Sequence, residues 1–390
     1  MIPMKHETFV LAPDSFKESM TAKEVCVAME KGLRKVFPEA NYIHVPMADG
    51  GEGTVQSLVD ATQGELFHLS VTGPLGTPVD AVYGIMGDGD VGVIEMASAS
   101  GIHHVNAQTR NPQVTTTYGT GELIRACLDK GIEKIILGIG GSATNDGGAG
   151  MAEALGARFF DGDDKPLPRG GGALGQLKRI DVSGLDPRLA QVEIIVACDV
   201  TNPLCGEQGA SHVFGPQKGA TPEMVAQLDA NLSHYADVVL QQLGKSVATA
   251  PGAGAAGGLG AGLMAFTRCV MQKGIDIVIE YSGLRDTLRG ADYCLTGEGR
   301  IDSQTRFGKT PYGVAKTAQA LQVPVIAVSG CVGDGIESLY EEGIDVIFGM
   351  IPRADPLASL LQEGPANMER ACENIGRLIR ISQARAASRS

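Results

Sequence analysis

The sequence has no cysteine pattern that marks a zinc site. Its eight cysteines are scattered, without a CxxC pair or a cluster of cysteine and histidine at zinc spacing, so we interpret them as buried thiols in a reducing compartment. It also has no tryptophan, and its first residues contain no basic region followed by a long apolar core. We therefore expect no signal peptide and predict a cytoplasmic location.

Features that favour a membrane or a nucleic acid as the main partner are also missing. Lysine and arginine number 32 against 45 aspartates and glutamates, a formal net charge of −13, although a local basic pocket could still bind a small anion. One uncharged stretch, residues 246–267, has six glycines between positions 252 and 262 and few bulky side chains, which argues against a transmembrane helix. We expect a small-molecule substrate, no nucleic acid and no membrane.

Glycine is the residue that the chain has in abundance. The 53 glycines show no collagen-like or low-complexity period, and they indicate many tight loops between strands and helices, as in α/β proteins. A length of 390 residues predicts two domains. Because consecutive strands in such folds pair in parallel, we expect the loops that follow them to gather at one edge of the sheet.

Apolar runs alternate with helical patterns near the N-terminus. Residues 9–12 and 42–45 are predicted strands, and each is followed by a polar loop and an amphipathic helix. The first helix begins at a capping box formed by Thr21 and Glu24. This β-α-β-α order is typical of a parallel sheet.

The alternation is interrupted in the middle of the chain. From residue 66 to residue 96, shorter apolar runs separated by turn residues indicate strands connected by hairpins, and strict alternation returns after residue 293. We therefore predict a doubly wound α/β sheet formed by residues 1–75 and 288–390. Residues 76–287 are predicted to insert into it as a second α/β domain.

The stretch at residues 134–151, KIILGIGGSATNDGGAGM, combines a buried strand with a glycine-rich loop. Its glycines free the backbone to adopt positive φ and to expose successive N–H groups, while short polar side chains stand between them. This combination suits an anion. The loop residues that we assign to anion binding are Gly140, Gly141, Ser142, Asn145, Gly147 and Gly148.

Charged side chains follow most of the predicted strands. Carboxylates beside glycines, together with a few cations, are the groups that bind Mg²⁺ and phosphates. Any one of them alone is more often a helix cap or a turn former, so it is their shared place at one edge of the sheet that indicates a site. They are Asp14, Lys17, Asp49, Asp146, Asp199, Glu298, Arg300 and Lys309.

One phosphate-binding motif is approached but not completed. Residues 303–310, SQTRFGKT, end like a P-loop, but a serine replaces the first glycine of the motif and no strong apolar strand immediately precedes it. We therefore expect no Walker A loop here, although Lys309 remains a candidate phosphate ligand.

A second pattern provides the alternative function. Gly138, Gly140 and Ala143 fit GxGxxA, and Asp161 ends a predicted strand at 157–160, about 20 residues later, as at a dinucleotide site. An NAD-dependent oxidoreductase that uses this loop is therefore the alternative, and a non-catalytic nucleotide or metabolite sensor is another. The seven histidines form no nucleophile motif and are interpreted as structural or surface residues.

Taken together, the motifs resemble those of the bacterial glycerate 2-kinases, the type-1 glycerate kinase family. The resemblance runs in one order from about residue 9 to about residue 382. The motifs are APDSFKES at 12–19, ADGGEGT at 48–54, GTGEL at 119–123, LGIGGSA at 137–143, NDGG at 145–148, ACDV at 197–200, FGPQKGA at 214–220 and TGEGRID at 296–302.

The resemblance implies ATP-dependent phosphorylation of D-glycerate at its 2-hydroxyl, with Mg²⁺, to give 2-phosphoglycerate in glyoxylate, glucarate or galactarate breakdown. It further implies a flavodoxin-like domain with an inserted, restriction-endonuclease-like α/β domain, and an active site in the cleft between them. Residue roles then follow as hypotheses. We assign phosphate binding to the loop at 140–148 and to Gly297, Gly299 and Lys309, and Mg²⁺ binding to Asp49, Asp146 or Glu298. The cationic side chains expected to bind glycerate and phosphate are Lys17, Arg300 and Lys309. The acid/base role is assigned to Asp199 or Asp14. The oligomeric state, for which a homo-oligomer is one alternative, and formation of 3-phosphoglycerate as a side product stay open.

Overall fold

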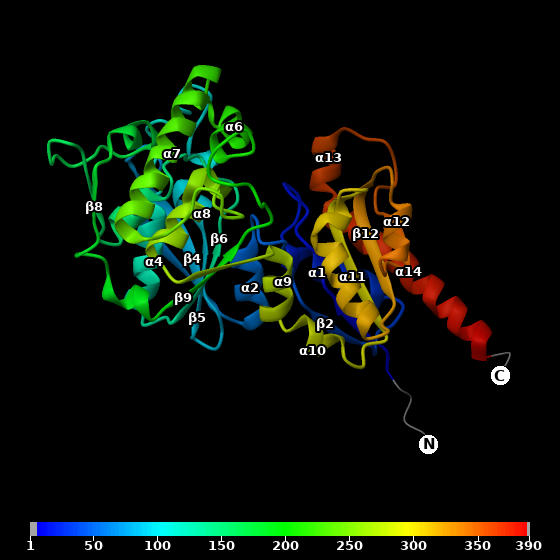
Figure 1. Cartoon of the computed structure of the whole chain (residues 1–390). Helices are drawn as coiled ribbons and strands as arrows, with labels where there is room; N and C mark the ends of the chain where they lie inside the picture. Colours follow the sequence, from blue (N-terminus) through cyan, green and yellow to red (C-terminus); the bar gives the residue numbers. More distant parts are fainter. Residues whose placement is uncertain (1–5, 388–390) are drawn as a thin grey trace. The chain divides into compact units, whose positions relative to one another are not determined.

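The computed structural model describes residues 6–387, which fall into two compact α/β units. The first unit comprises Met1–Asp49, Gln56–Thr62 and Ile275–Ser390, and the second comprises Gly50–Val55 and Gln63–Gly274. Figure 1 colours the chain in sequence order, so that the first unit combines blue N-terminal strands with yellow and orange C-terminal ones. The general prediction of an α/β protein is confirmed.

The first unit is built on a parallel five-stranded sheet with the order β13-β12-β11-β1-β2. Its two halves join where β1 pairs with β11, and Phe9 of β1 lies opposite Tyr42 and Tyr293 with stacked rings at 5.5 and 5.3 Å between centroids. Such cross-strand aromatic pairs stabilise the register of strands that are far apart in sequence. The strands are β1 Thr8–Leu11, β2 Asn41–His44, β11 Tyr293–Ile301, β12 Val325–Val332 and β13 Val346–Gly349.

Helices pack on this sheet around a core that includes Phe9, Leu33 and Met368. The predicted capping box is confirmed, because the Glu24 amide donates to the Thr21 hydroxyl and the Thr21 amide donates to the Glu24 carboxylate. The helices are α1 Ala22–Arg34, α2 Thr54–Thr62, α9 Gly274–Tyr281, α10 Leu284–Leu288, α11 Thr310–Ala320, α12 Glu337–Glu341, α13 Leu357–Gln362 and α14 Gly364–Ala387, of which α2 and α9 begin in the second unit.

The second unit is built on a mixed six-stranded sheet with the order β10-β9-β6-β5-β4-β3. The pairs β3–β4 and β4–β5 are antiparallel, as the predicted hairpins require, and the other pairs are parallel. The strands are β3 Glu65–Thr72, β4 Pro78–Ile85, β5 Val91–Glu95, β6 Lys134–Gly138, β9 Glu193–Ala197 and β10 Cys269–Gln272, with β7 Arg158–Phe160 and β8 Arg179–Asp181 in a separate pair.

Six α-helices and several short 3-10 turns surround the second sheet in the described residues. The longest, α7, begins as predicted, with Thr221 as its cap and Pro222 in its first turn. The helices are α3 Met96–Ser100, α4 Tyr118–Asp129, α5 Ala149–Ala154, α6 Ala210–Phe214, α7 Pro222–Leu243 and α8 Ala255–Phe266. The 3-10 turns are η1 Ile102–His104, η2 Gly171–Gln176, η3 Pro187–Ala190 and η4 Pro216–Lys218, and η5 Thr305–Phe307 lies in the first unit.

The borders of the two units differ from the predicted domain borders at residues 75 and 288. Strand β3 pairs with β4 from Glu65–Ile85 to Thr72–Pro78, which places it in the second sheet. Most of α9, and all of α10, belongs to the first unit. A hairpin strand gains its hydrogen bonds from its partner, so pairing rather than position along the chain decides which sheet a strand joins.

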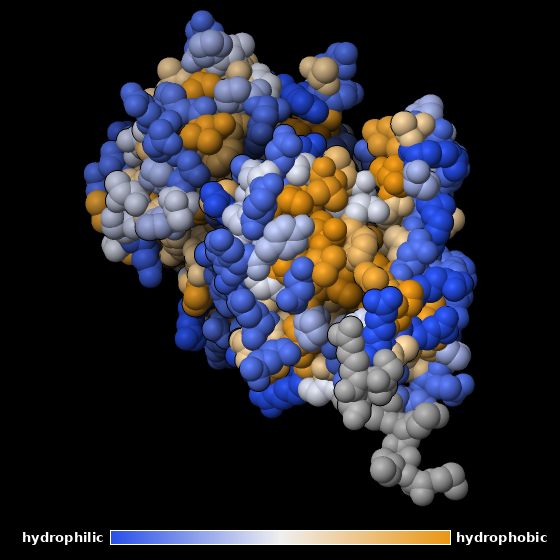
Figure 2. Space-filling model, turned by 90° about the vertical axis from the view of Figure 1, so that its right-hand side faces the viewer, coloured by the Kyte–Doolittle hydropathy of each residue, from blue (hydrophilic) through white to orange (hydrophobic). Residues whose placement is uncertain are grey.

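Some large apolar side chains of the first unit lie exposed on its surface. The face of the molecule in Figure 2 shows apolar side chains in orange among polar ones. In the first unit, Val346 on β13 and Leu378 and Ile381 on α14 are among the large apolar residues that are more than a third exposed. Within residues 6–387, no helix combines the length and hydropathy that a membrane span requires.

Candidate active site

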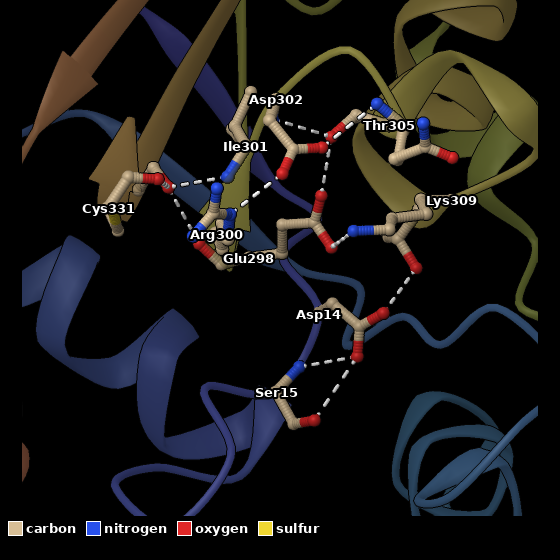
Figure 3. A network of polar contacts seen from close by, with 12 residues as sticks. Asp14, Ser15, Glu298, Arg300, Ile301, Asp302, Thr305, Lys309 and Cys331 are labelled. Carbon is tan, nitrogen blue, oxygen red and sulfur yellow. Dashed lines mark hydrogen bonds and ion pairs between the residues drawn. The ribbon is translucent and has the colours of Figure 1, made fainter. Parts of the chain in front are cut away.

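In the first unit, charged residues meet at the carboxyl ends of the two central strands. Asp14 lies in the loop after β1, Glu298 lies near the end of β11, and Lys309 precedes the first turn of α11. Figure 3 shows the side chains of Glu298 and Lys309 directed toward each other, with Asp14 close by. This is the edge at which sheets of this kind bind ligands.

Asp14 is held by three hydrogen bonds. The Thr310 hydroxyl donates to Oδ2 at 2.5 Å, while the amide and hydroxyl of Ser15 donate to Oδ1 at 2.6 and 3.3 Å. Burial raises the pKa of Asp14 to about 6; the hydrogen bonds oppose this rise, and the negative charge of Asp49 adds to it. Asp14 is therefore a fixed carboxylate that changes protonation near neutral pH.

Glu298 lies between a cation and a hydroxyl group. Its side chain is 12 % exposed, with the Lys309 ammonium 3.6 Å from Oε2 and the Thr305 hydroxyl donating to Oε1 at 2.9 Å. Burial raises the pKa of Glu298 to about 7, against the lowering effects of Lys309 and Thr305, and the charges of Asp14 and Asp49 raise it further. Glu298 and Lys309 thus form a partly buried pair beside Asp14.

Three carboxylates of this unit lie close enough for their charges to interact, namely those of Asp14, Asp49 and Glu298. Oxygen ligands of this type fit Mg²⁺, which proteins usually bind through one or two carboxylates together with substrate phosphates. Within residues 6–387, no group of three or more His, Cys, Asp or Glu side chains is placed to hold a metal ion by itself.

The other predicted residues of this unit lie in the loop after β1 and on β11. Arg300 is exposed and donates from Nε to Asp302 at 2.7 Å, and Lys17 is exposed in the loop after β1. Gly297 and Gly299, predicted in a phosphate-binding loop, lie instead within β11, which runs on to Ile301. The reason is the pairing with β12, against which a Cβ at Gly297 would collide with the Val328 carbonyl oxygen.

The segment at 303–310 does follow a strand, contrary to the sequence interpretation, because β11 extends to Ile301. Its backbone is nevertheless unlike a P-loop. The amide groups of Ser303, Thr305 and Phe307 donate to protein carbonyls, whereas P-loop amides point at the phosphates. Lys309 is therefore a candidate phosphate ligand through its side chain.

In the second unit, the glycine-rich stretch divides into an exposed part and a buried part. Gly140 and Gly141 are exposed, whereas residues 142–148 are buried. Gly147 and Gly148 take positive φ against α7 and α8, and the Gly147 amide donates to the Gly257 carbonyl. Among the predicted loop glycines in this stretch, therefore, Gly140 and Gly141 are the two that can reach a ligand.

Asp146 differs from its predicted role as a metal ligand. Its carboxylate is fully buried and accepts hydrogen bonds from the Thr117 amide at 2.8 Å, the Thr117 hydroxyl at 2.9 Å, and the amides of Gly148 and Gly150 at 3.1 and 3.3 Å. Asn145 is likewise buried and donates to the Ser211 hydroxyl at 3.0 Å. Both residues hold the turn together, which leaves no surface of Asp146 for a metal ion.

The dinucleotide alternative also fails on geometry. A dinucleotide fold needs the strand that ends at Asp161 to lie in the same parallel sheet as β6. Instead, β7 pairs antiparallel with β8 in a separate two-stranded sheet. The Gly138, Gly140 and Ala143 pattern is therefore a coincidence of glycine content.

Asp199 and three residues that the sequence interpretation missed complete the description. Asp199 is exposed after β9 and accepts a hydrogen bond from the Gly274 amide at 3.1 Å. Glu95 ends β5 and accepts from the Val55 amide at 2.9 Å, a position that the rule of charged residues at strand ends would have found. Thr310 and Lys218 carry no such signal, because only the folded chain brings them to Asp14 and Thr144.

Two α/β units with charged side chains and exposed glycines at the carboxyl ends of their strands define the class, an α/β enzyme. The model of the "Glycerate kinase family" matches residues 9–380. The chain belongs to the glycerate kinase family.

Individual relatives agree over nearly the whole length. A glycerate kinase of Haemophilus influenzae is 54% identical over 371 residues, 95% of this chain and 98% of the relative. The glycerate 2-kinase of Escherichia coli strain K12 is 51% identical over 372 residues, again 95% and 98%. A crystal structure from Salmonella typhimurium LT2, provisionally assigned as glycerate kinase 2, matches with a TM-score of 0.90 and 48% identity over 97% of this chain and 100% of that chain.

Proposed function

We propose that this protein transfers the terminal phosphoryl group of ATP to the 2-hydroxyl of D-glycerate, giving 2-phosphoglycerate, ADP and a proton. The observation that carries the proposal is the 51% identity to a glycerate 2-kinase over 95% of the chain. A kinase needs a phosphoryl donor, an anchor for the acceptor and a group that takes the hydroxyl proton. The residues of both units offer candidates for these roles.

Asp14 is the proposed base. A carboxylate whose pKa is about 6 accepts a proton efficiently near neutral pH. The short hydrogen bond from Thr310 fixes its orientation. Asp199, the other candidate, is exposed after β9, which makes it the weaker choice.

Cations and backbone groups are proposed to hold the anionic substrates. Lys309 stands beside Glu298 at the start of α11, where the helix dipole also favours an anion. Lys17 and Arg300 are exposed on the same unit and remain candidates for the glycerate carboxylate. In the second unit, we assign the exposed backbone at Gly140 and Gly141 to phosphate. The location of the site between the two domains stays a prediction.

Asp49 and Glu298 are the proposed Mg²⁺ ligands. Both are half-buried carboxylates that interact electrostatically with Asp14. When bound, the metal would neutralise charge that develops on the transferring phosphoryl group.

We also propose that the first unit is flavodoxin-like. Numbered within the unit, its strand order β2-β1-β11-β12-β13 reads 2-1-3-4-5, which is the order of flavodoxin-like sheets. The restriction-endonuclease-like description of the second unit stays a prediction.

The test measures ADP release with ATP, Mg²⁺ and D-glycerate. We expect turnover that depends on D-glycerate, with no reduction of NAD in its place. Asp14→Asn should lower kcat by about 10² to 10⁴, the usual contribution of a general base. The kcat of the matched variant Asp199→Asn should stay within tenfold of that of the wild type. If Asp199→Asn instead loses more kcat than Asp14→Asn, Asp199 is the base.

A further inference from the structure

Lys218 is a buried lysine, and the packing of the fold alone does not explain why a lysine is buried there. It ends the short turn η4 within the FGPQKGA segment, and its side chain is 2% exposed. In residues 6–387, its ammonium makes one hydrogen bond, to the carbonyl oxygen of Thr144 at 2.6 Å. An apolar side chain of the same length would fill this place without bringing a charge out of water.

The turn that Lys218 holds contains a negative charge, that of Asp146, which interacts with the Lys218 ammonium. Burial lowers the pKa of Lys218 to about 7, and the negative charge of Asp146, which is fully buried two residues beyond Thr144, opposes this fall. Asp146 in turn binds the amides of Thr117, Gly148 and Gly150. Lys218, which reaches the turn from η4, and Asp146 within the turn therefore both hold residues 144–150.

Other contacts fix the same turn from the opposite side. The Ala143 amide donates to the Ser100 carbonyl at 3.0 Å, and the Thr115 hydroxyl donates to the Ala143 carbonyl at 2.8 Å. A Cβ at Gly257 would collide with the Thr144 carbonyl oxygen. Thr144 is thus held between Lys218 and the glycine-rich start of α8, while Gly140 and Gly141, four and three residues earlier, are exposed.

Unpartnered polar atoms mark this region as built for more than packing. The hydroxyl oxygen of Thr144, the amide oxygen of Asn145 and the hydroxyl of Tyr235 are fully buried and have no hydrogen-bond partner in the described residues. Buried polar groups without protein partners are commonly bridged by internal water. Internal water at these atoms would allow the ammonium to use its remaining protons.

We propose that Lys218 is a positioning residue that holds the glycine-rich turn, through Thr144, in the shape that presents Gly140 and Gly141 to a nucleotide phosphate. The inference rests on the proposed function, because that function assigns these two glycines to phosphate. Lys218 itself touches neither substrate. Its removal should therefore weaken nucleotide binding and leave the affinity for glycerate nearly unchanged.

The test measures ADP binding by calorimetry, together with KM for ATP and for D-glycerate. For Lys218→Met we expect at least a tenfold increase in the Kd of ADP and in KM for ATP, with KM for D-glycerate within threefold of the wild type. If that variant does not fold, Lys218→Gln takes its place with the same expected loss, because its amide nitrogen falls one bond short of Thr144.

A control variant separates positioning from general destabilisation. Val247→Ala truncates a buried side chain elsewhere in the same unit and should keep the Kd of ADP within twofold. A Lys218→Met variant that also binds ADP within twofold of the wild type would overturn the inference. Because ADP binding does not depend on glycerate, a wild type that binds ADP without phosphorylating glycerate would refute the proposed function alone.

Discussion

At the scale of single residues, the proposed chemistry of the first unit depends on the hydrogen bond that the Thr310 hydroxyl donates to the Asp14 carboxylate. Burial raises the pKa of Asp14 to about 6, and the hydrogen bond from Thr310 limits this rise by stabilising the ionised form. Since a base must be ionised to accept a proton, activity should fall as the pH drops below this pKa. On the proposed role of Asp14 as the base, Thr310 should set the acid limit of the reaction.

Thr310→Val tests this point. Without the hydroxyl donor, the ionised form of Asp14 loses a hydrogen bond to a charged group, so the pKa of Asp14 rises and the acid limb of kcat/KM should move upward by about one pH unit. The pH profile of kcat/KM is the measurement. Thr287→Val should leave the profile in place, because the Thr287 hydroxyl donates to the Gly283 carbonyl of its own segment. An unchanged limb in Thr310→Val would separate Asp14 from the step that limits the rate.

The candidate residues could be found from the sequence, but their partners could not. Asp14, Glu298 and Lys309 were predicted because charged residues after parallel strands meet at one edge. Thr310 lies 296 positions from Asp14, and nothing in a single sequence indicates that contact. Asp146 was wrongly assigned to a metal ion, because an aspartate among glycines reads the same whether its carboxylate faces solvent or closes a buried turn.

At the scale of elements, short-range patterns predicted starts better than ends. The capping box of α1 and the Thr221–Pro222 start of α7 were correct because these signals act within one turn. The extension of β11 through Gly297 and Gly299 was missed, because glycines favour a loop until a neighbouring strand pairs with them. Helix α14 was missed although Met368, Cys372, Ile375 and Ile379 repeat with helical spacing.

The start of α8 supports the glycine-rich turn, and Gly257→Ala tests how strongly. Gly257 has a φ of +66° and would place a Cβ against the Thr144 carbonyl oxygen. Strain of about 1–2 kcal/mol from the left-handed backbone and about 1–3 kcal/mol from overpacking should lower the free energy of unfolding. Thermal unfolding followed by circular dichroism measures the loss.

Gly244→Ala is the matched control for that substitution. Gly244 has a φ of +67° at the end of α7, but a Cβ there would meet no atom within 4 Å. Gly244→Ala should therefore lose only the stability that corresponds to the strain of the left-handed backbone. A Gly257→Ala variant that is no less stable than Gly244→Ala would contradict the packing described for Thr144.

At the scale of the whole molecule, two sheets with different connections divide the chain. The five-stranded sheet is parallel throughout and combines strands from both ends of the sequence, whereas the six-stranded sheet opens with antiparallel hairpins. The sequence predicted this division from the change in spacing near residue 66, yet placed the border after residue 75. Hairpin pairing is a tertiary choice, so the strand at 65–72 could have belonged to either sheet until its partner was known.

The most direct test of the account is the position of the new phosphate ester. The protein is incubated with ATP, Mg²⁺ and D-glycerate, and the product is then given enolase that is free of phosphoglycerate mutase. If the phosphoryl group is on the 2-hydroxyl, enolase should convert the product to phosphoenolpyruvate at once. The ultraviolet absorbance of phosphoenolpyruvate measures this conversion. Conversion that requires added mutase would place the phosphate on the 3-hydroxyl, and the absence of any D-glycerate-dependent product would contradict the kinase function itself.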